Sequence, residues 1–154
     1  MDLQARLQTA TKEAMKARDS LRLSTLRLIG AAIKDRQIAA RSGDTEDRDL
    51  SEADLIALLS KMVKQRQESA RAYEEGGRLE LAERELAEIR LIQEFLPRQL
   101  SQAEIEAAID AAIAGLEASS VRDMGRVMTE LRARHGGQMD FATAGALVRA
   151  RLMG

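Results

Sequence analysis

Apolar residues recur at intervals of three and four along most of the chain, the spacing that places side chains on one face of an α-helix. This spacing predicts a first helix from Leu3 to about Arg18. A second helix is expected to begin at Asp19 or Ser20, because a short polar side chain can cap its first turn. Its apolar residues occupy much of the circumference, namely Leu21, Leu23, Leu26, Leu28, Ile29, Ile33 and Ile38. We therefore predict a central helix that touches several neighbours, one of which approaches closely at Gly30.

The next two predicted helices lie on either side of a glycine pair. Ser51 and Asp54 have the spacing of a capping box, which predicts a third helix from this point to about residue 75. Gly76 and Gly77 end it, and a fourth helix is expected over residues 79–96. We predict that these two helices form an antiparallel hairpin around an aliphatic core. The polar run over residues 41–49 has no helical periodicity, which predicts a mobile loop.

One charged pair is expected inside this hairpin or at its rim. Arg66 interrupts the apolar stripe of the third helix, and Glu85 interrupts that of the fourth. Counting outward from the glycine pair places Arg66 opposite positions near 87. We therefore predict an ion pair between Arg66 and either Glu88 or Glu85.

The only proline, Pro97, is expected to separate two domains. Proline lacks an amide hydrogen and disfavours helical geometry in the residue before it, so the fourth helix should end there. Three shorter apolar stripes follow, with expected helix starts at Ser101, Ser120 and Asp140. The sequence thus predicts an all-α protein, with an N-terminal four-helix domain at residues 1–97 and a small C-terminal three-helix domain at residues 98–154.

Composition narrows the class of protein. The absence of cysteine excludes disulfides, thiolate metal sites and cysteine nucleophiles. The first residues carry charges throughout, and no run approaches the ~18 apolar residues that a membrane span needs. From these features we expect a cytoplasmic protein without contact to a membrane.

The residue types that carry catalysis occur in patterns that helix structure explains. His135 lies at an expected helix end beside two glycines, and Ser51, Ser101 and Ser120 are explained as helix caps. The glutamates at 80, 83, 85 and 88 lack the Glu-x-x-His pattern of a helical di-metal site. We assign no catalytic residue, metal or cofactor, and we lean against an enzyme without excluding one.

Charge is distributed unevenly along the chain. Residues 1–41 hold nine basic and four acidic residues, whereas residues 42–96 hold eight basic and fourteen acidic ones. From Ser120 to the end there are six arginines and three acidic residues. A basic C-terminal segment is compatible with nucleic-acid contact, but this excess is too small to predict it alone.

Two segments resemble a known family. They are KQRQESARAYEEGGRLELAERELAEIRLIQEFLPRQLS (Lys64 to Ser101) and MGRVMTELRARHGG (Met124 to Gly137), and both are similar to the GatB/YqeY family. These proteins resemble the C-terminal tail of the B subunit of glutamine-dependent aspartyl/glutamyl-tRNA amidotransferase. The resemblance covers essentially the whole chain and implies an all-α protein with a three-helix C-terminal domain.

The resemblance implies a role in tRNA metabolism. On this basis the first hypothesis is a non-catalytic accessory module that binds tRNA weakly through Arg122, Arg126, Arg132, Arg134, Arg149 and Arg151. The alternative is a helical protein-interaction module, whose partner would be a synthetase or an amidotransferase subunit. Unpaired apolar surface on the C-terminal helices would favour it. A third hypothesis is the activity that the family label implies, a carbon-nitrogen ligase with glutamine as amido-N-donor. The tRNA species, the protein partner and the oligomeric state do not follow from the sequence.

Overall fold

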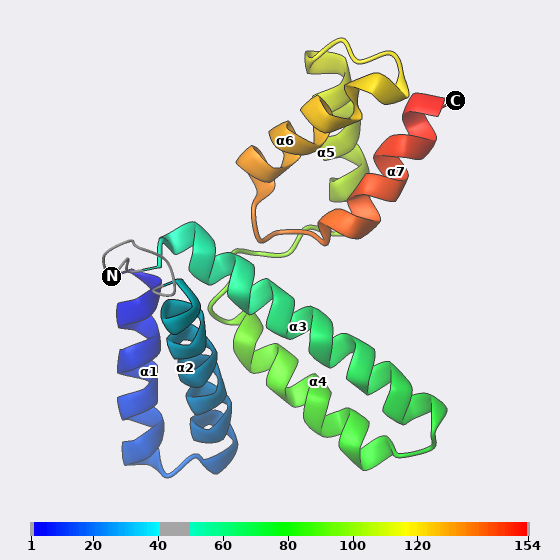
Figure 1. Cartoon of the computed structure of the whole chain (residues 1–154). Helices are drawn as coiled ribbons and strands as arrows, with labels where there is room; N and C mark the ends of the chain where they lie inside the picture. The colour runs from blue at the N-terminus through cyan, green and yellow to red at the C-terminus, as the bar shows by residue number, and fades with distance from the viewer. Residues whose placement is uncertain (1, 41–49, 154) are drawn as a thin grey trace. The chain divides into compact units, whose positions relative to one another are not determined.

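The described residues of the computed structural model, 2–40 and 50–153, are all-helical, as expected, with no strand among them (Figure 1). The expected loop at residues 41–49 lies outside the described part. The elements are α1 (Leu3–Ala17), α2 (Ser20–Ala40), α3 (Glu52–Glu75), α4 (Leu79–Gln93), α5 (Gln102–Gly115), a 3₁₀ turn η1 (Val121–Asp123), α6 (Met124–His135) and α7 (Phe141–Met153).

Contacts between residues divide the chain into two compact units, Met1–Leu96 and Pro97–Gly154. The helices α1 to α4 belong to the first, which we call unit 1, and α5 to α7 belong to the second, unit 2. Each unit encloses its own aliphatic core. The chain therefore has two separate sets of buried side chains with a proline at the boundary.

Short polar side chains fix where several helices begin. The Asp2 carboxylate accepts a hydrogen bond from the Ala5 amide at 2.7 Å and caps α1. Ser51 caps α3 and Ser101 caps α5, each within a reciprocal capping box. In the second box, hydrogen bonds from the Arg98 guanidinium and from the Ser101 amide lower the pKa of Glu104 to about 2. These caps satisfy amides that the first helical turn leaves without partners.

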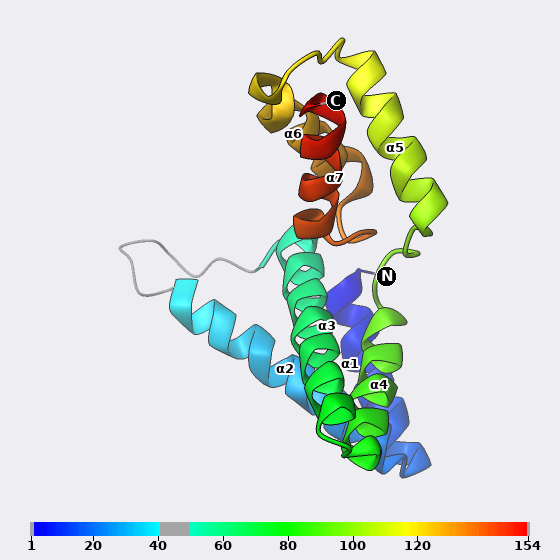
Figure 2. The ribbon, with the colours of Figure 1, turned by 90° about the vertical axis from the view of Figure 1, so that its right-hand side faces the viewer.

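The hairpin of α3 and α4 is the most extensive helix pairing in unit 1, and Figures 1 and 2 show the two helices side by side. Gly77 joins them at a φ of 74°, a left-handed conformation that glycine adopts without strain. The facing stripes bury Leu55, Leu59, Met62, Ile89 and Ile92. The helices α1 and α2 complete the core with aliphatic side chains of their own.

Phe95 anchors the end of α4 to the first two helices. Its side chain is buried, and the guanidinium groups of Arg6 and Arg22 lie 5.6 and 5.9 Å from its ring centroid. Arg22 also forms an ion pair with Glu94 at 2.6 Å, and Arg6 donates to the Glu94 carbonyl at 3.2 Å. One of the few aromatic residues thus holds α1, α2 and α4 together, a role that apolar periodicity alone did not indicate.

The core of unit 2 is formed by α5, α6 and α7. The helix expected to start at Ser120 begins instead with the 3₁₀ turn η1. Its Asp123 carboxylate accepts hydrogen bonds from the Ser119 and Ser120 amides, and these bonds, with Arg126, lower the pKa of Asp123 to about 2. The Leu100 amide donates to the Gln138 carbonyl at 2.9 Å, which ties the start of the unit to the turn before α7.

The prediction that apolar residues of α2 contact neighbours around its circumference is wrong in part. Thr25, Leu26 and Ile29 are buried, but Leu21, Leu28 and Ile38 are 41, 47 and 55% exposed. The reason is geometric, since α1, α3 and α4 all pack on one side of α2. The other side faces away from the helices of unit 1 and retains apolar side chains.

The charged side chains of the hairpin meet at Glu88. The Arg66 Nε donates to Glu88 Oε2 at 2.9 Å, with only 15 and 10% of the two side chains exposed. Arg66 Nη1 also donates to the Met62 carbonyl at 3.2 Å. The exposed Arg84 reaches the other carboxylate oxygen of Glu88 at 3.9 Å. Glu88 is thus a nearly buried charge whose closest cation is Arg66.

Replacing Glu88 by alanine is expected to lower the free energy of unfolding by about 3 kcal/mol, because Arg66 would remain nearly buried without a partner. Arg84→Ala is the matched control, since it removes an exposed member of the same cluster and should cost less than about 1 kcal/mol. Urea unfolding followed by circular dichroism measures both. If the two variants lose the same stability, Arg66 and Glu88 do not act as a buried pair.

Candidate functional site

The six arginines assigned to the expected tRNA surface all lie in unit 2, but four of them have intramolecular partners. Arg126 pairs with Asp123 at 2.8 Å, Arg151 pairs with Asp110 at 3.2 Å, and Arg134 pairs with Glu130. The Arg132 guanidinium lies 5.7 Å from the ring centroid of Phe141. Contacts within unit 2 therefore explain the positions of these four side chains.

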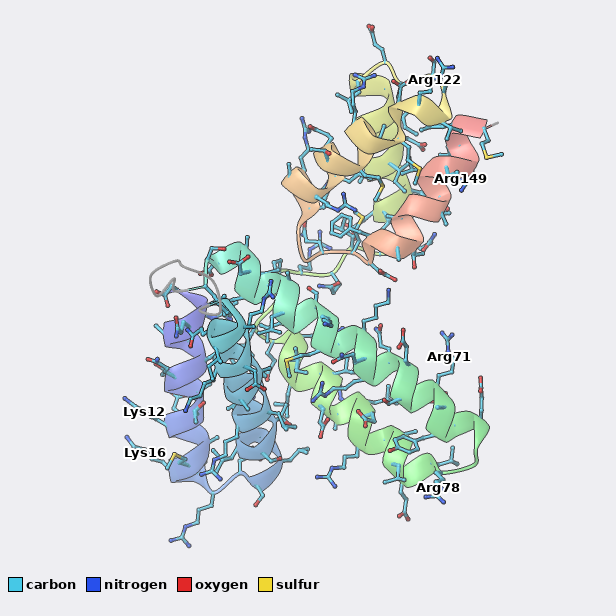
Figure 3. All side chains as sticks on the ribbon, in the orientation of Figure 1. Lys12, Lys16, Arg71, Arg78, Arg122 and Arg149 are labelled. Carbon is cyan, nitrogen blue, oxygen red and sulfur yellow. The ribbon has the colours of Figure 1, made fainter. Side chains whose placement is uncertain are left out.

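Arg122 and Arg149 form no ion pair with any described residue, and Figure 3 labels both. They come from different elements, η1 and α7. No contact within the chain tests whether the six arginines bind an anionic polymer. Unpaired apolar surface on the C-terminal helices would favour a protein-interaction module, and the described residues of unit 2 include two large exposed apolar side chains, Val121 and Met153.

A groove of about 310 Å³ lies between α1 and α2 in unit 1. Figure 2 shows why it forms, since the two helices diverge from the turn that joins them. Its apolar surface comes from core side chains whose edges reach the groove. The lining residues are Gln4, Leu7, Gln8 and Thr11 of α1 and Leu26, Ile29, Gly30, Ile33, Lys34 and Gln37 of α2.

Polar groups without intramolecular partners lie among these lining residues. The side-chain amides of Gln4, Gln8 and Gln37 and the Lys34 ammonium make no hydrogen bond or ion pair with the described residues. Thr11 differs, because its hydroxyl donates to the Leu7 carbonyl at 2.8 Å. Lys34 is the only charged residue in the described lining. Lys12 and Lys16 point away from α2 in Figure 3 and do not line the groove.

Gly30 occupies a position where the fold itself does not require glycine. It lies in the interior of α2, and a Cβ atom added to it would meet nothing within 4 Å. The expectation that a neighbouring helix approaches closely at Gly30 is therefore wrong. The space that a side chain would occupy at this position is instead part of the groove. The sequence pattern predicts helix packing at this glycine, because only the structure shows that the facing position is open.

The described residues contain no cluster of histidine and carboxylate side chains that could hold a metal ion. Among these residues no helix is long and apolar enough to span a membrane. His135 lies at the end of α6, where its Nδ1 is 3.1 Å from Gln138 Oε1. The groove between α1 and α2, in contrast, combines an apolar floor with free side-chain amides and one cation, Lys34.

Comparison with known proteins identifies a family and several relatives. A sequence model of the family described as Yqey-like protein matches residues 4–152. "Altered inheritance of mitochondria protein 41, mitochondrial" of Lachancea thermotolerans is 34% identical over 122 residues, which cover 78% of this chain and 63% of the relative. The protein of the same name in Kluyveromyces lactis is 31% identical over 118 residues, with coverage of 75% and 60%. That of Pyrenophora tritici-repentis is 29% identical over 135 residues, with coverage of 84% and 71%.

These relatives correct two expectations. The tRNA-amidotransferase function, with its tRNA-binding role, is contradicted because the similar proteins are named for the inheritance of mitochondria. The expectation of a cytoplasmic protein conflicts with the mitochondrial location in the same names. The chain spans about three fifths of the length of the first two relatives, so their full activities are not carried over.

The family match confirms the resemblance that the segments Lys64 to Ser101 and Met124 to Gly137 indicated. It extends from α1 to the last turn of α7 and therefore includes the groove and both cores. On this evidence the chain belongs to the YqeY-like protein family.

Proposed function

We propose that this protein is a non-catalytic carrier or sensor of a small amphipathic anion, which binds in the groove between α1 and α2. The proposed ligand has an apolar body and one carboxylate, sulfonate or phosphate group. The observation that carries the proposal is the open space above Gly30.

A glycine in a helix interior destabilises the helix by about 1 kcal/mol relative to alanine. At Gly30 no contact within the chain offsets that loss, because an alanine methyl group would fit without touching another atom within 4 Å. A molecule bound against the helix backbone would explain the glycine at position 30, because any side chain there would take up part of the space of that molecule. The groove volume of about 310 Å³ lies at the lower end of the range for small-molecule sites.

The chemistry of the lining defines the class of ligand. The apolar floor around Ile29 and Ile33 favours a hydrocarbon or aromatic body. Lys34 lies one helical turn beyond Gly30, about 6 Å along the axis, so it can pair with an anionic group at one end of that body. The three glutamine amides offer donors and acceptors along the sides, which suits a ligand with a polar end and disfavours a purely apolar one.

Gly30→Leu is expected to fill the groove and weaken binding of the fluorescent probe anilinonaphthalene sulfonate by about 10-fold or more, because its side chain occupies the site of the apolar body. Gly30→Ala is the graded variant, since its single methyl group takes up less of the space. It should weaken binding less than Gly30→Leu and raise the free energy of unfolding by about 1 kcal/mol. Lys34→Gln should weaken binding about 3- to 10-fold, whereas Lys12→Gln should have no effect. Fluorescence titration and urea unfolding measure these changes. Equal affinity of the wild-type protein and Gly30→Leu would show that the groove is not the binding site.

The name of the relatives supplies the cellular process for a second proposal. Their sequence similarity covers three quarters or more of this chain, and their name refers to altered inheritance of mitochondria. We propose that the chain takes part in the corresponding process by holding its ligand, and that the groove is needed for this role.

This role is tested by expressing the chain, directed to mitochondria by a leader segment, in a Kluyveromyces lactis strain that lacks its relative. Wild-type chain is expected to restore the transmission of mitochondria to daughter cells, and Lys12→Gln, which changes a residue outside the groove, should act like wild type. Gly30→Leu should fail at equal expression because its groove is filled. Full rescue by Gly30→Leu would separate the cellular role from the groove.

We also propose that the two compact units are independent domains, one with four helices and one with three. The support is that Pro97 separates two complete aliphatic cores, each with its own buried side chains.

A fragment beginning at Arg98 is accordingly expected to be helical by circular dichroism and to unfold cooperatively on heating. Its core includes the buried side chains of Ile109, Val127, Leu131 and Val148, but a chain this short has little stability in reserve. Leu131→Ala should therefore abolish the transition, and Arg122→Ala, at an exposed position, should leave it unchanged. An unfolded wild-type fragment would contradict the assignment of independent domains.

A further inference from the structure

The exposed side of α2 carries a regular seam that the helices of unit 1 do not cover. Its residues follow one another at alternating intervals of three and four, and all are exposed. They are Leu21, Ser24, Leu28, Ala31, Asp35 and Ile38. Four of the six are apolar, and the three largest of these are 41 to 55% exposed. We call these residues the α2 seam.

Alternating intervals of three and four are the a and d positions of the heptad repeat of coiled coils. The repeat gives a period of 3.5 residues, which keeps a seam in contact with a supercoiled partner helix. A face that needed only to be solvated would have no reason to keep large apolar residues at this spacing. The pattern therefore points to a helix as the partner.

The seam is complementary to itself in an antiparallel arrangement. Placing Leu28 opposite Ala31 of a second copy also brings Leu21 opposite Ile38 and Ser24 opposite Asp35. Each a position then faces a d position, as an antiparallel pair of helices requires. Leu21 therefore faces Ile38 at each end of the pairing, and Leu28 faces the smaller Ala31 in the two central layers.

The polar layer selects this arrangement over its alternatives. A Ser24 hydroxyl can donate to the Asp35 carboxylate opposite, and this occurs twice because the pairing has two-fold symmetry. A parallel pair in register would place Asp35 against Asp35, where like charges repel. A shift of the antiparallel pair by one heptad would lose this hydrogen bond, because it places the Asp35 carboxylate against Ala31. Single polar residues in otherwise apolar seams are known to determine register in this way.

The basic residues beside the seam are compatible with the pairing. Arg27 of one copy approaches Lys34 of the other, but Asp35 lies in the same layer and offsets their repulsion. The seam is also separate from the groove, because Gly30 lies on a different face of α2 from Leu28 and Ala31. The groove lining meets the seam only at Lys34, which borders both surfaces.

We propose that this protein forms a two-fold symmetric homodimer through an antiparallel pairing of the α2 seam. The inference goes beyond ligand binding and does not depend on it. The seam covers only two and a half heptads, so we expect a dimer that dissociates at micromolar concentrations.

Sedimentation equilibrium over a concentration series tests the association with the full chain. Wild-type protein is expected to change from monomer to dimer, and Leu28→Glu should remain monomeric up to about 200 µM because it places two charges in the central layers. Met15→Glu changes another exposed apolar residue, outside the seam, and should dimerise like wild type. Gly30→Leu should also dimerise, which separates this surface from the groove. Circular dichroism verifies that each variant is folded.

Disulfide cross-linking tests the relative orientation of the two α2 helices. The chain has no cysteine, so each introduced cysteine is the only one in its variant. Under mild oxidation, a mixture of Leu21→Cys and Ile38→Cys chains is expected to give a covalent heterodimer, while neither variant alone should cross-link. Cross-linking of each variant with itself would show a parallel pair and overturn the proposed register. A monomeric wild-type protein, or a dimer that Leu28→Glu leaves intact, would overturn the interface.

Discussion

The hairpin of α3 and α4 is the packing constraint on which unit 1 depends, because it supplies the surface that α1 and α2 cover. Its apolar stripes determine which faces meet, and the Arg66–Glu88 pair adds a directional contact at one level of the interface. A nearly buried charge is tolerated there only with its partner in place. A slip of one helix past the other would separate Arg66 from Glu88 and leave each charge nearly buried without a partner, which is unfavourable. The register of the hairpin is therefore fixed by both packing and charge.

The position of α1 and α2 follows from contacts at the end of this hairpin. Phe95 and Glu94 receive Arg6 and Arg22, so both helices are held where α4 ends. Elsewhere α1 and α2 diverge, which leaves the groove on one side and the α2 seam on another.

The comparisons separate what family resemblance conveys from what it does not. The segments that resemble an amidotransferase tail led to the correct family and to an all-helical fold. They did not give the function, since the curated relatives are named for mitochondrial inheritance. Four of the six arginines chosen for tRNA contact also have carboxylate or aromatic neighbours within unit 2. The number of basic residues in a sequence segment does not distinguish such paired cations from free ones.

The sequence by itself determined the helices and much of their pairing, because periodicity, capping residues and glycine or proline stops act over a few neighbouring residues. Counting outward from Gly76 and Gly77 placed Arg66 opposite residue 87, and its carboxylate partner lies at Glu88. Only the tertiary structure decided which face of α2 is covered, that the space above Gly30 is open, and that Phe95 joins three helices. These features depend on the angles between helices, which arise from packing between distant segments and leave no local signal in the sequence.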